Sequence, residues 1–203
     1  MFNTIEEILK DLINGKIICM ADDENLENEI DMCCLARHAT TENINYMITN
    51  ARGLVCCPMS AELCDKIGFT PMASEKIKAD KLGTPFYNSV DLDNGSTGVS
   101  AEERGKTARH ISSVSVTIDD FVSPGHLFTL RARSGLLNER KGHTEGSVQL
   151  AKLCNENAAV ICEIINTDGQ MLRVKDFEGW NSNRNLKLCT IEQVENYVNS
   201  VRK

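Results

Sequence analysis

The sequence predicts an α/β (α+β) sandwich, in which helices pack on a mixed β-sheet. Short apolar strand signals alternate with amphipathic helix signals, and some strands are joined by tight turns while others are joined by helices. No internal repeat, low-complexity tract or Pro/Gly/Ser linker divides the 203 residues. We therefore expect residues 1–203 to form a single domain.

The expected elements of the first half alternate between helix and strand. Thr4 and Glu7 form a capping box before apolar residues that share one helix face, and Gly15 ends this helix. The following elements are a strand at 16–21, a strand at 31–37, a helix capped by Thr41, a strand at 54–59, a helix from Ser60, and a loop at 69–85.

The second half continues the alternation. Ser100 and Glu103 form another capping box, which opens a helix toward His110. The other elements are a strand at 86–91, a turn at 94–98, strands at 114–118 and 127–132, a helix at 144–155, a strand at 158–165, a hairpin turn at 166–169 leading into 170–174, a strand at 186–190, and a helix capped by Thr190 and Gln193.

Composition excludes several classes of protein. The formal charge of −7 argues against binding of duplex nucleic acid, which requires a basic surface. No apolar run is long enough to span a bilayer, so no membrane partner is expected. The N-terminus lacks the pattern of a secretory signal, and the expected location is therefore cytoplasmic.

Nine cysteines form an odd set without any CxxC pair, and their neighbours are mostly apolar. We interpret them as reduced side chains that serve as small core hydrophobes, and a zinc site is not expected. They are Cys19, Cys33, Cys34, Cys56, Cys57, Cys64, Cys154, Cys162 and Cys189.

The stretch DDENLENEID at 22–31 places six carboxylates in ten residues. A solvated acidic loop is about as well supported by composition as a functional site. An EF-hand is excluded, since Asn28 stands where its glycine is required. Closely packed carboxylates repel one another, and a bound cation offsets that repulsion. Oxygen ligands favour Mg²⁺ or Mn²⁺.

The stretch RKGHTE at 140–145 combines two cations with a glycine and a threonine where a loop meets a helix. Backbone N–H groups, the Arg140 guanidinium and the Thr144 hydroxyl could hold a phosphate there, with His143 beside it as a metal ligand or base. A basic loop with a capping threonine is the alternative.

Two further residues are candidates for catalysis. Glu163 lies among apolar residues in a predicted strand, where a carboxylate is costly unless it is paired or functional. Such a group tends to have a raised pKa suited to proton transfer. His126 follows Pro-Gly, a position more typical of a turn residue than of a catalytic one. The small-residue stretch at 96–104 indicates architecture rather than chemistry.

Together and in order, these motifs resemble the 3,4-dihydroxy-2-butanone 4-phosphate synthase family of riboflavin biosynthesis. The family pattern is DDEDRENEGD, GLxCxP, TTGxSAxDR, RPGHxFPLRA, RxGHTE, GVxCE and TIxDL. This chain carries DDENLENEID at 22–31, GLVCCP at 53–58, STGVSAEER at 96–104, SPGHLFTLRA at 123–132, RKGHTE at 140–145, AVICE at 159–163 and TIEQV at 190–194.

The resemblance implies a Mg²⁺-dependent (or Mn²⁺-dependent) lyase. It would convert D-ribulose 5-phosphate to 3,4-dihydroxy-2-butanone 4-phosphate and formate, as a homodimer with active sites at the interface. Many relatives carry a GTP cyclohydrolase II domain, which is not expected here. By position, the implied metal ligands are Glu27 and His143, the implied catalytic residues are His126, Glu163 and Asp31, and the implied substrate-binding residues are Leu26, Glu27, Asp31, Arg140, Lys141, Gly142, His143, Thr144 and Glu163.

Four positions depart from the family pattern. Leu26 and Ser123 stand where the family usually has Arg, Ile30 replaces a glycine, and Thr129 replaces a proline. Because Ile30 replaces a glycine, we expect a different path of the acidic loop. Three alternatives to the lyase follow: a paralogue acting on another sugar phosphate or ketose, a non-catalytic subunit that binds a metabolite or partner, and a redox role of Cys56 and Cys57.

Overall fold

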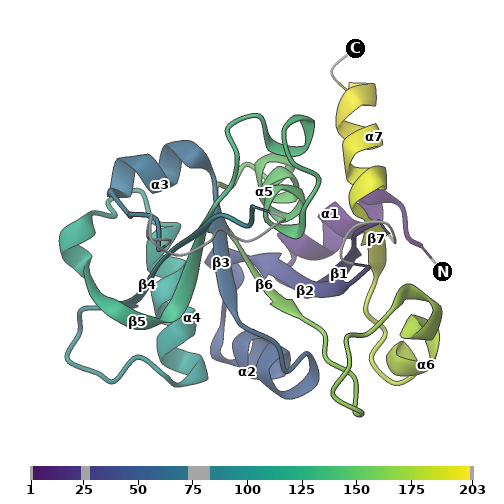
Figure 1. Ribbon diagram of the computed structural model, residues 1–203, viewed down its shortest axis with the longest axis horizontal. Helices are drawn as coiled ribbons and strands as arrows, with labels where there is room; N and C mark the ends of the chain where they lie inside the picture. Colours follow the sequence, from purple (N-terminus) through teal and green to yellow (C-terminus); the bar gives the residue numbers. More distant parts are fainter. Residues whose placement is uncertain (1, 24–27, 73–82, 202–203) are drawn as a thin grey trace.

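The computed structural model describes residues 2–23, 28–72 and 83–201, which fold around one mixed sheet (Figure 1). The sheet has the strand order β4-β5-β3-β6-β2-β1-β7. Its strands are β1 (Ile18–Ala21), β2 (Ile30–Leu35), β3 (Cys56–Met59), β4 (Phe86–Leu92), β5 (Phe121–Arg131), β6 (Ala159–Glu163) and β7 (Leu188–Thr190).

Both kinds of strand pairing occur in this sheet. β1 and β2 form an antiparallel pair, and β6 pairs antiparallel with both β2 and β3. β3 and β5 are parallel, as are β1 and β7, and in both pairs other strands intervene along the chain. The predicted mixed sheet is confirmed.

Helices cover both faces of the sheet (Figure 1). In the described part of the chain they are α1 (Ile5–Ile13), α2 (Thr41–Asn50), α3 (Ala61–Ile67), α4 (Ala101–Ile111), α5 (His143–Leu153), α6 (Phe177–Asn181) and α7 (Ile191–Val201). None of these helices has the length and apolar character that crossing a membrane requires.

Two apolar clusters form the core, one on each face of the sheet. The first includes Met47 of α2 and Ile111 of α4, which pack on residues such as Met32. The second includes Leu12 of α1 and Leu150 of α5. All nine cysteines are buried and free of disulfides, as predicted. The adjacent residues Cys33 and Cys34, and likewise Cys56 and Cys57, belong to different clusters, because successive strand residues point to opposite faces of the sheet.

The predicted caps locate most helix starts correctly. Both capping boxes, at Thr4 and Ser100, are present, and the hydroxyl of Ser60 caps α3. The helix α2 begins at Thr41, but its N-cap is Thr40. Thr190 and Gln193 exchange hydrogen bonds at the start of α7.

Three strand predictions need correction. The segment 114–118 is not a strand: Val114 is 93% exposed, Val116 alone of these residues is buried in the core, and the 3₁₀ turn Ile118–Asp120 begins at its end. The strand predicted at 127–132 begins at Phe121, where it pairs with the end of β4. The predicted strand at 170–174 is reduced to one bridge between Ile165 and Met171.

Candidate functional site

Two carboxylates lie side by side on adjacent strands. Asp31 of β2 and Glu163 of β6 are register partners in the antiparallel pair, so their side chains project from the same face of the sheet. Asp31 is 2% exposed and Glu163 is half-buried. The two residues are 132 positions apart in the sequence, and the pairing of β2 with β6 brings them together.

The first residues of α5 form another part of the site, next to the two carboxylates of the sheet. His143 is the first residue of the helix, and its Nε2 lies 4.0 Å from Oδ1 of Asp31. His143 and Thr144 are both buried. Gly142 occupies the N-cap position without a side-chain cap, and His143 and Thr144 of the first turn line the cavity at this helix N-terminus.

Arg140 reaches the same place from the loop before α5. Its Nη1 lies 2.6 Å from Oε2 of Glu145, and its Nη2 donates a hydrogen bond to the Thr84 hydroxyl at 3.2 Å. A Cβ on Gly142 would lie only 2.0 Å from Nη1 of Arg140. The glycine of this motif therefore leaves the space that the guanidinium occupies.

A cavity of about 270 Å³ lies where these elements meet. Its lining consists of Glu29, Asp31, Cys56, Thr84, Phe86, Leu130, Arg140, His143, Thr144, Ile161 and Glu163. Predicted site residues from three separate motifs thus converge on one cavity, whose lining combines charged and apolar side chains. Two further predicted residues, Leu26 and Glu27, lie outside the described residues.

The segment Gly53–Leu54 holds the carboxylate of Glu163. Neither residue is among the site residues predicted from the sequence. The backbone N–H of Leu54 donates to Oε2 of Glu163 at 2.8 Å. A Cβ on Gly53 would lie 2.3 Å from the carbonyl oxygen of Glu163 and 2.7 Å from Oε2. A glycine is therefore required at this contact.

Cys56 contributes a buried thiol to the cavity wall. Burial, followed by the nearby charges of Glu163 and Asp31, raises the pKa of this thiol well above its usual value. Burial likewise raises the pKa of the Cys57 thiol. Because the thiolate is the reactive form, both cysteines are poorly suited to a redox role at neutral pH.

His126 lies outside the lining of this cavity and forms a pair with the buried carboxylate of Asp91 in β4. Its Nδ1 lies 2.7 Å from Oδ2 of Asp91, and its backbone N–H donates to Oδ1 at 2.8 Å. The Asp91 side chain is 8% exposed, whereas that of His126 is 47% exposed. Gly98, at a φ of +81°, makes room for Asp91, because a Cβ there would lie 2.1 Å from the carboxylate.

This dyad has the form of an acid–base pair in which a carboxylate orients an imidazole. His126 is not among the residues that line the 270 Å³ cavity of the same chain. Asp91 is not among the residues predicted from the sequence. It carries no local motif, and only the pairing of β4 with β5 brings it to His126.

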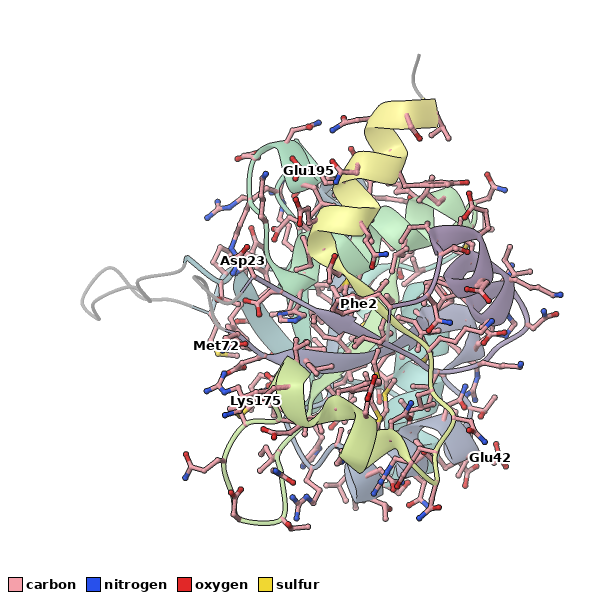
Figure 2. The ribbon with its side chains drawn as sticks, turned by 90° about the vertical axis from the view of Figure 1, so that its right-hand side faces the viewer. Phe2, Asp23, Glu42, Met72, Lys175 and Glu195 are labelled. Carbon is pink, nitrogen blue, oxygen red and sulfur yellow. The ribbon has the colours of Figure 1, made fainter. Side chains whose placement is uncertain are left out.

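Lys141 points away from the cavity and toward α7. Its ammonium lies 2.7 Å from Oε2 of Glu195, and this hydrogen bond raises the pKa of Lys141. Both side chains line a second cavity, of about 760 Å³, to which Phe2 and Asp23 also contribute. Figure 2 shows the side of the molecule that carries Glu195, Asp23 and Phe2.

Two of the departures from the family pattern are explained by local structure. Ile30 is fully buried in β2 and does not have a positive φ. The positive φ in this segment occurs at Asn28, at 55°. The Ser123 hydroxyl donates to the carbonyl oxygen of Ser89, in the strand pair that carries His126. Ser123 is not part of the cavity lining.

The donors near His143 fit a hard divalent cation. An imidazole and the carboxylates of Asp31, Glu29 and Glu163 line one cavity, and oxygen-rich sets of this type suit Mg²⁺. Within residues 2–23, 28–72 and 83–201, no three such side chains are already close enough to form a metal site.

These features define an α/β protein in which carboxylates, a histidine and an arginine converge on a small cavity beside the sheet. The chain belongs to the 3,4-dihydroxy-2-butanone 4-phosphate synthase family, whose sequence model matches residues 6–197.

Individual relatives support this assignment. The chain is 45% identical over 198 residues to the riboflavin biosynthesis protein RibBA of Bacillus mycoides (strain KBAB4), covering 97% of this chain and 49% of the relative. It therefore spans about half the length of the curated relatives that it matches.

Solved structures share the fold. A 3,4-dihydroxy-2-butanone 4-phosphate synthase in complex with two magnesium ions is 31% identical, with a TM-score of 0.91 and coverage of 99% of both chains. RibBX of A. baumannii, a two-domain 3,4-dihydroxy-2-butanone 4-phosphate synthase, is 37% identical, with a TM-score of 0.89 over 96% of this chain and 57% of that one. The predicted fold class is confirmed.

Proposed function

We propose that this chain is a lyase of riboflavin biosynthesis that converts D-ribulose 5-phosphate to 3,4-dihydroxy-2-butanone 4-phosphate and formate. One observation carries the proposal: in a member of this family, Asp31, Glu163 and three residues of the RKGHTE stretch line one cavity, the three being Arg140, His143 and Thr144. The proposal covers residues 1–203 as one domain, with both core clusters built on one sheet.

In this proposal the phosphate of the substrate binds at the start of α5. Arg140 supplies a guanidinium, Thr144 supplies a hydroxyl, and the first turn of the helix supplies backbone N–H groups. Gly142 permits close approach of this backbone. Lys141 remains a predicted substrate contact, and it would have to leave Glu195 to reach the ligand.

In this proposal, the carboxylates of Asp31 and Glu163 and the imidazole of His126 act as general acids and bases. Asp31 and Glu163 flank the cavity as register partners, so one can accept a proton from carbon or hydroxyl while the other returns one. Leu54 and Gly53 fix Glu163 for this role. The removal of formate requires several proton transfers, which agrees with more than one acid–base group.

We propose Mg²⁺ as the cofactor, with Mn²⁺ as a substitute, held by Glu27 and His143. When bound, the cation supplies Lewis-acid polarisation of the sugar's carbonyl and hydroxyl oxygens. His143 lies at the start of α5, next to Asp31, where its imidazole and the neighbouring carboxylates provide suitable donors. The related structure with two magnesium ions supports this choice.

We further propose a cytoplasmic homodimer with active sites at the interface. His126 is exposed outside the cavity of its own chain, so the dyad of one copy would serve the cavity of the other. Apolar residues near the dyad support such an interface: Val99 follows Gly98, Val122 is a register partner of Asp91, and both are about half exposed. Nine free thiols agree with a reducing compartment.

Incubation of the purified protein with D-ribulose 5-phosphate and Mg²⁺ tests the activity. We expect formate and the four-carbon product to accumulate, and EDTA to abolish both. His143→Ala should reduce kcat/KM by at least about 10³-fold, since it removes a metal ligand. The matched control is His38→Ala: His38 hydrogen-bonds the carbonyl of Ile13, far from the cavity lining, and its variant should retain activity.

A paralogue with another substrate is the second candidate, and Leu26 is the observation that favours it, since the family usually has Arg there. In that case the wild type would be inactive on D-ribulose 5-phosphate, and Leu26→Arg would gain activity. If neither protein binds Mg²⁺ or the sugar phosphate by calorimetry, both enzymatic proposals fail and a non-catalytic subunit is favoured.

A further inference from the structure

Glu145 carries the most deeply buried carboxylate at the edge of the cavity. It lies in the first turn of α5 and is 0% exposed. Burying a carboxylate is costly unless the charge is paired and hydrogen-bonded. Both oxygens have such partners: Oε2 lies 2.6 Å from Nη1 of Arg140, and Oε1 accepts the backbone N–H of Arg133 at 3.1 Å.

The partner of this carboxylate is the cavity's guanidinium. Arg140 lines the cavity with 15% of its side chain exposed, and it is held at a second point by the Thr84 hydroxyl. Gly142 lies against the same guanidinium. Because a guanidinium presents five N–H donors in a planar fork, one group can bind a carboxylate, a hydroxyl and a ligand oxygen simultaneously.

From these contacts we propose that Glu145 is a positioning residue, which fixes Arg140 in the orientation that binds the phosphate of the substrate. This inference rests on the proposed function and deepens it. Arg140 has a long and flexible side chain, and holding it in place before the ligand arrives removes the entropy cost of ordering it on binding. The bond from Arg133 anchors the carboxylate to the segment after β5, so the support does not depend on α5 alone.

Steady-state kinetics with Glu145→Gln tests the proposal. The substitution keeps shape and removes charge, so we expect KM for D-ribulose 5-phosphate to rise about tenfold while kcat stays within about twofold, as for loss of binding shared by ground and transition states. Glu145→Asp keeps the charge but withdraws the carboxylate by one methylene, and its KM should also rise.

Glu139→Gln is the matched control. Glu139 lies in the same loop, is exposed, and accepts the backbone N–H of Gly135 at 3.0 Å without contacting Arg140. Its KM should equal that of the wild type. A double-mutant cycle adds a readout that a purely structural role would not give: in an Arg140→Met background, Glu145→Gln should leave KM unchanged, because the positioned group is already absent.

The crystal structure of Glu145→Gln separates this proposal from the proposed function. If the wild type is inactive on D-ribulose 5-phosphate, the proposed function fails. The position of the Arg140 guanidinium in the variant's crystal structure then still tests whether Glu145 positions Arg140. A displaced guanidinium supports that role. An unmoved guanidinium, an unchanged KM in Glu145→Gln and Glu145→Asp, or additive effects in the cycle would overturn it.

Discussion

Gly53 and Glu163 form a contact that a single methyl group would break. In Gly53→Ala the new Cβ would lie 2.3 Å from the Glu163 carbonyl oxygen and 2.7 Å from Oε2, so the backbone or the carboxylate must move. We expect a loss of about 1–3 kcal/mol in the free energy of unfolding, as for other overpacked sites. We also expect kcat to fall at least about tenfold, because the base is displaced.

Urea denaturation and steady-state kinetics measure the two effects of Gly53→Ala. Gly179→Ala is the control, since a Cβ at Gly179 in α6 meets no atom within 4 Å. Its activity should match that of the wild type, and its unfolding midpoint should be equal or slightly higher, because alanine is favoured over glycine in a helix. Wild-type kinetics in Gly53→Ala would show that the contact with Glu163 is unimportant for catalysis.

The residues that could be found in advance are those that carry their own local signal. Glu163 is conspicuous as a carboxylate in an apolar strand, and RKGHTE combines cations with a helix start. Asp91 shows no such signal, and Glu145 lies within RKGHTE but has no local feature that assigns it a role. Their roles arise from partners, His126 and Arg140, and in the first case the partner lies 35 positions away on another strand.

At the scale of the element, the capping box of α4 is a local device whose energy can be tested. The Ser100 hydroxyl accepts the N–H of Glu103, and the Glu103 carboxylate accepts the N–H of Ser100. Ser100→Ala should reduce the free energy of unfolding by about 1 kcal/mol in urea denaturation. The exposed Ser115 provides the control, and Ser115→Ala should leave the unfolding midpoint unchanged.

The same capping box predicts a dependence on pH. The hydrogen bond from the Ser100 backbone N–H, with smaller contributions from Ser96 and the Ser100 hydroxyl, lowers the pKa of Glu103 from 4.5 to about 2. A lowered pKa means that the stabilisation is complete above pH 4.5 and is lost as pH falls toward 2. Glu103→Gln should therefore lose less stability than the wild type over this range, and parallel pH profiles would contradict the prediction.

Helices were easier to predict than strand limits because caps are local and strand pairing is not. Thr4, Ser60 and Ser100 mark helix starts within one residue. The alternation at 114–118 looks like a strand, yet these residues find no pairing partner in the described chain and Val114 lies in solvent. The segment 121–126 lacks a clear strand pattern and is one nonetheless, because β4 pairs with it.

At the scale of the molecule, the mixed sheet followed from the kinds of connection between strands, but the strand order did not. The placement of β6 between β3 and β2 decides that Asp31 meets Glu163, and this order depends on register over more than a hundred residues. No periodicity in the sequence encodes that register. The resemblance could name the candidate site residues one by one. Their arrangement in space, such as the pairing of Asp31 with Glu163, became visible only in the fold.

The separation of His126 from the cavity leads to a prediction about subunits. If the dyad of one copy serves the cavity of the other, His126→Ala and Glu163→Gln damage different halves of each shared site. Each variant alone should be nearly inactive. Co-expressed with different affinity tags, they should form mixed dimers in which one of two sites is intact, so random pairing should restore about a quarter of wild-type activity. Mixed dimers isolated through both tags should reach about half, and the readout is formate release per dimer. If both residues instead act within one chain, every site in the mixed dimer lacks one of them, and no activity will return.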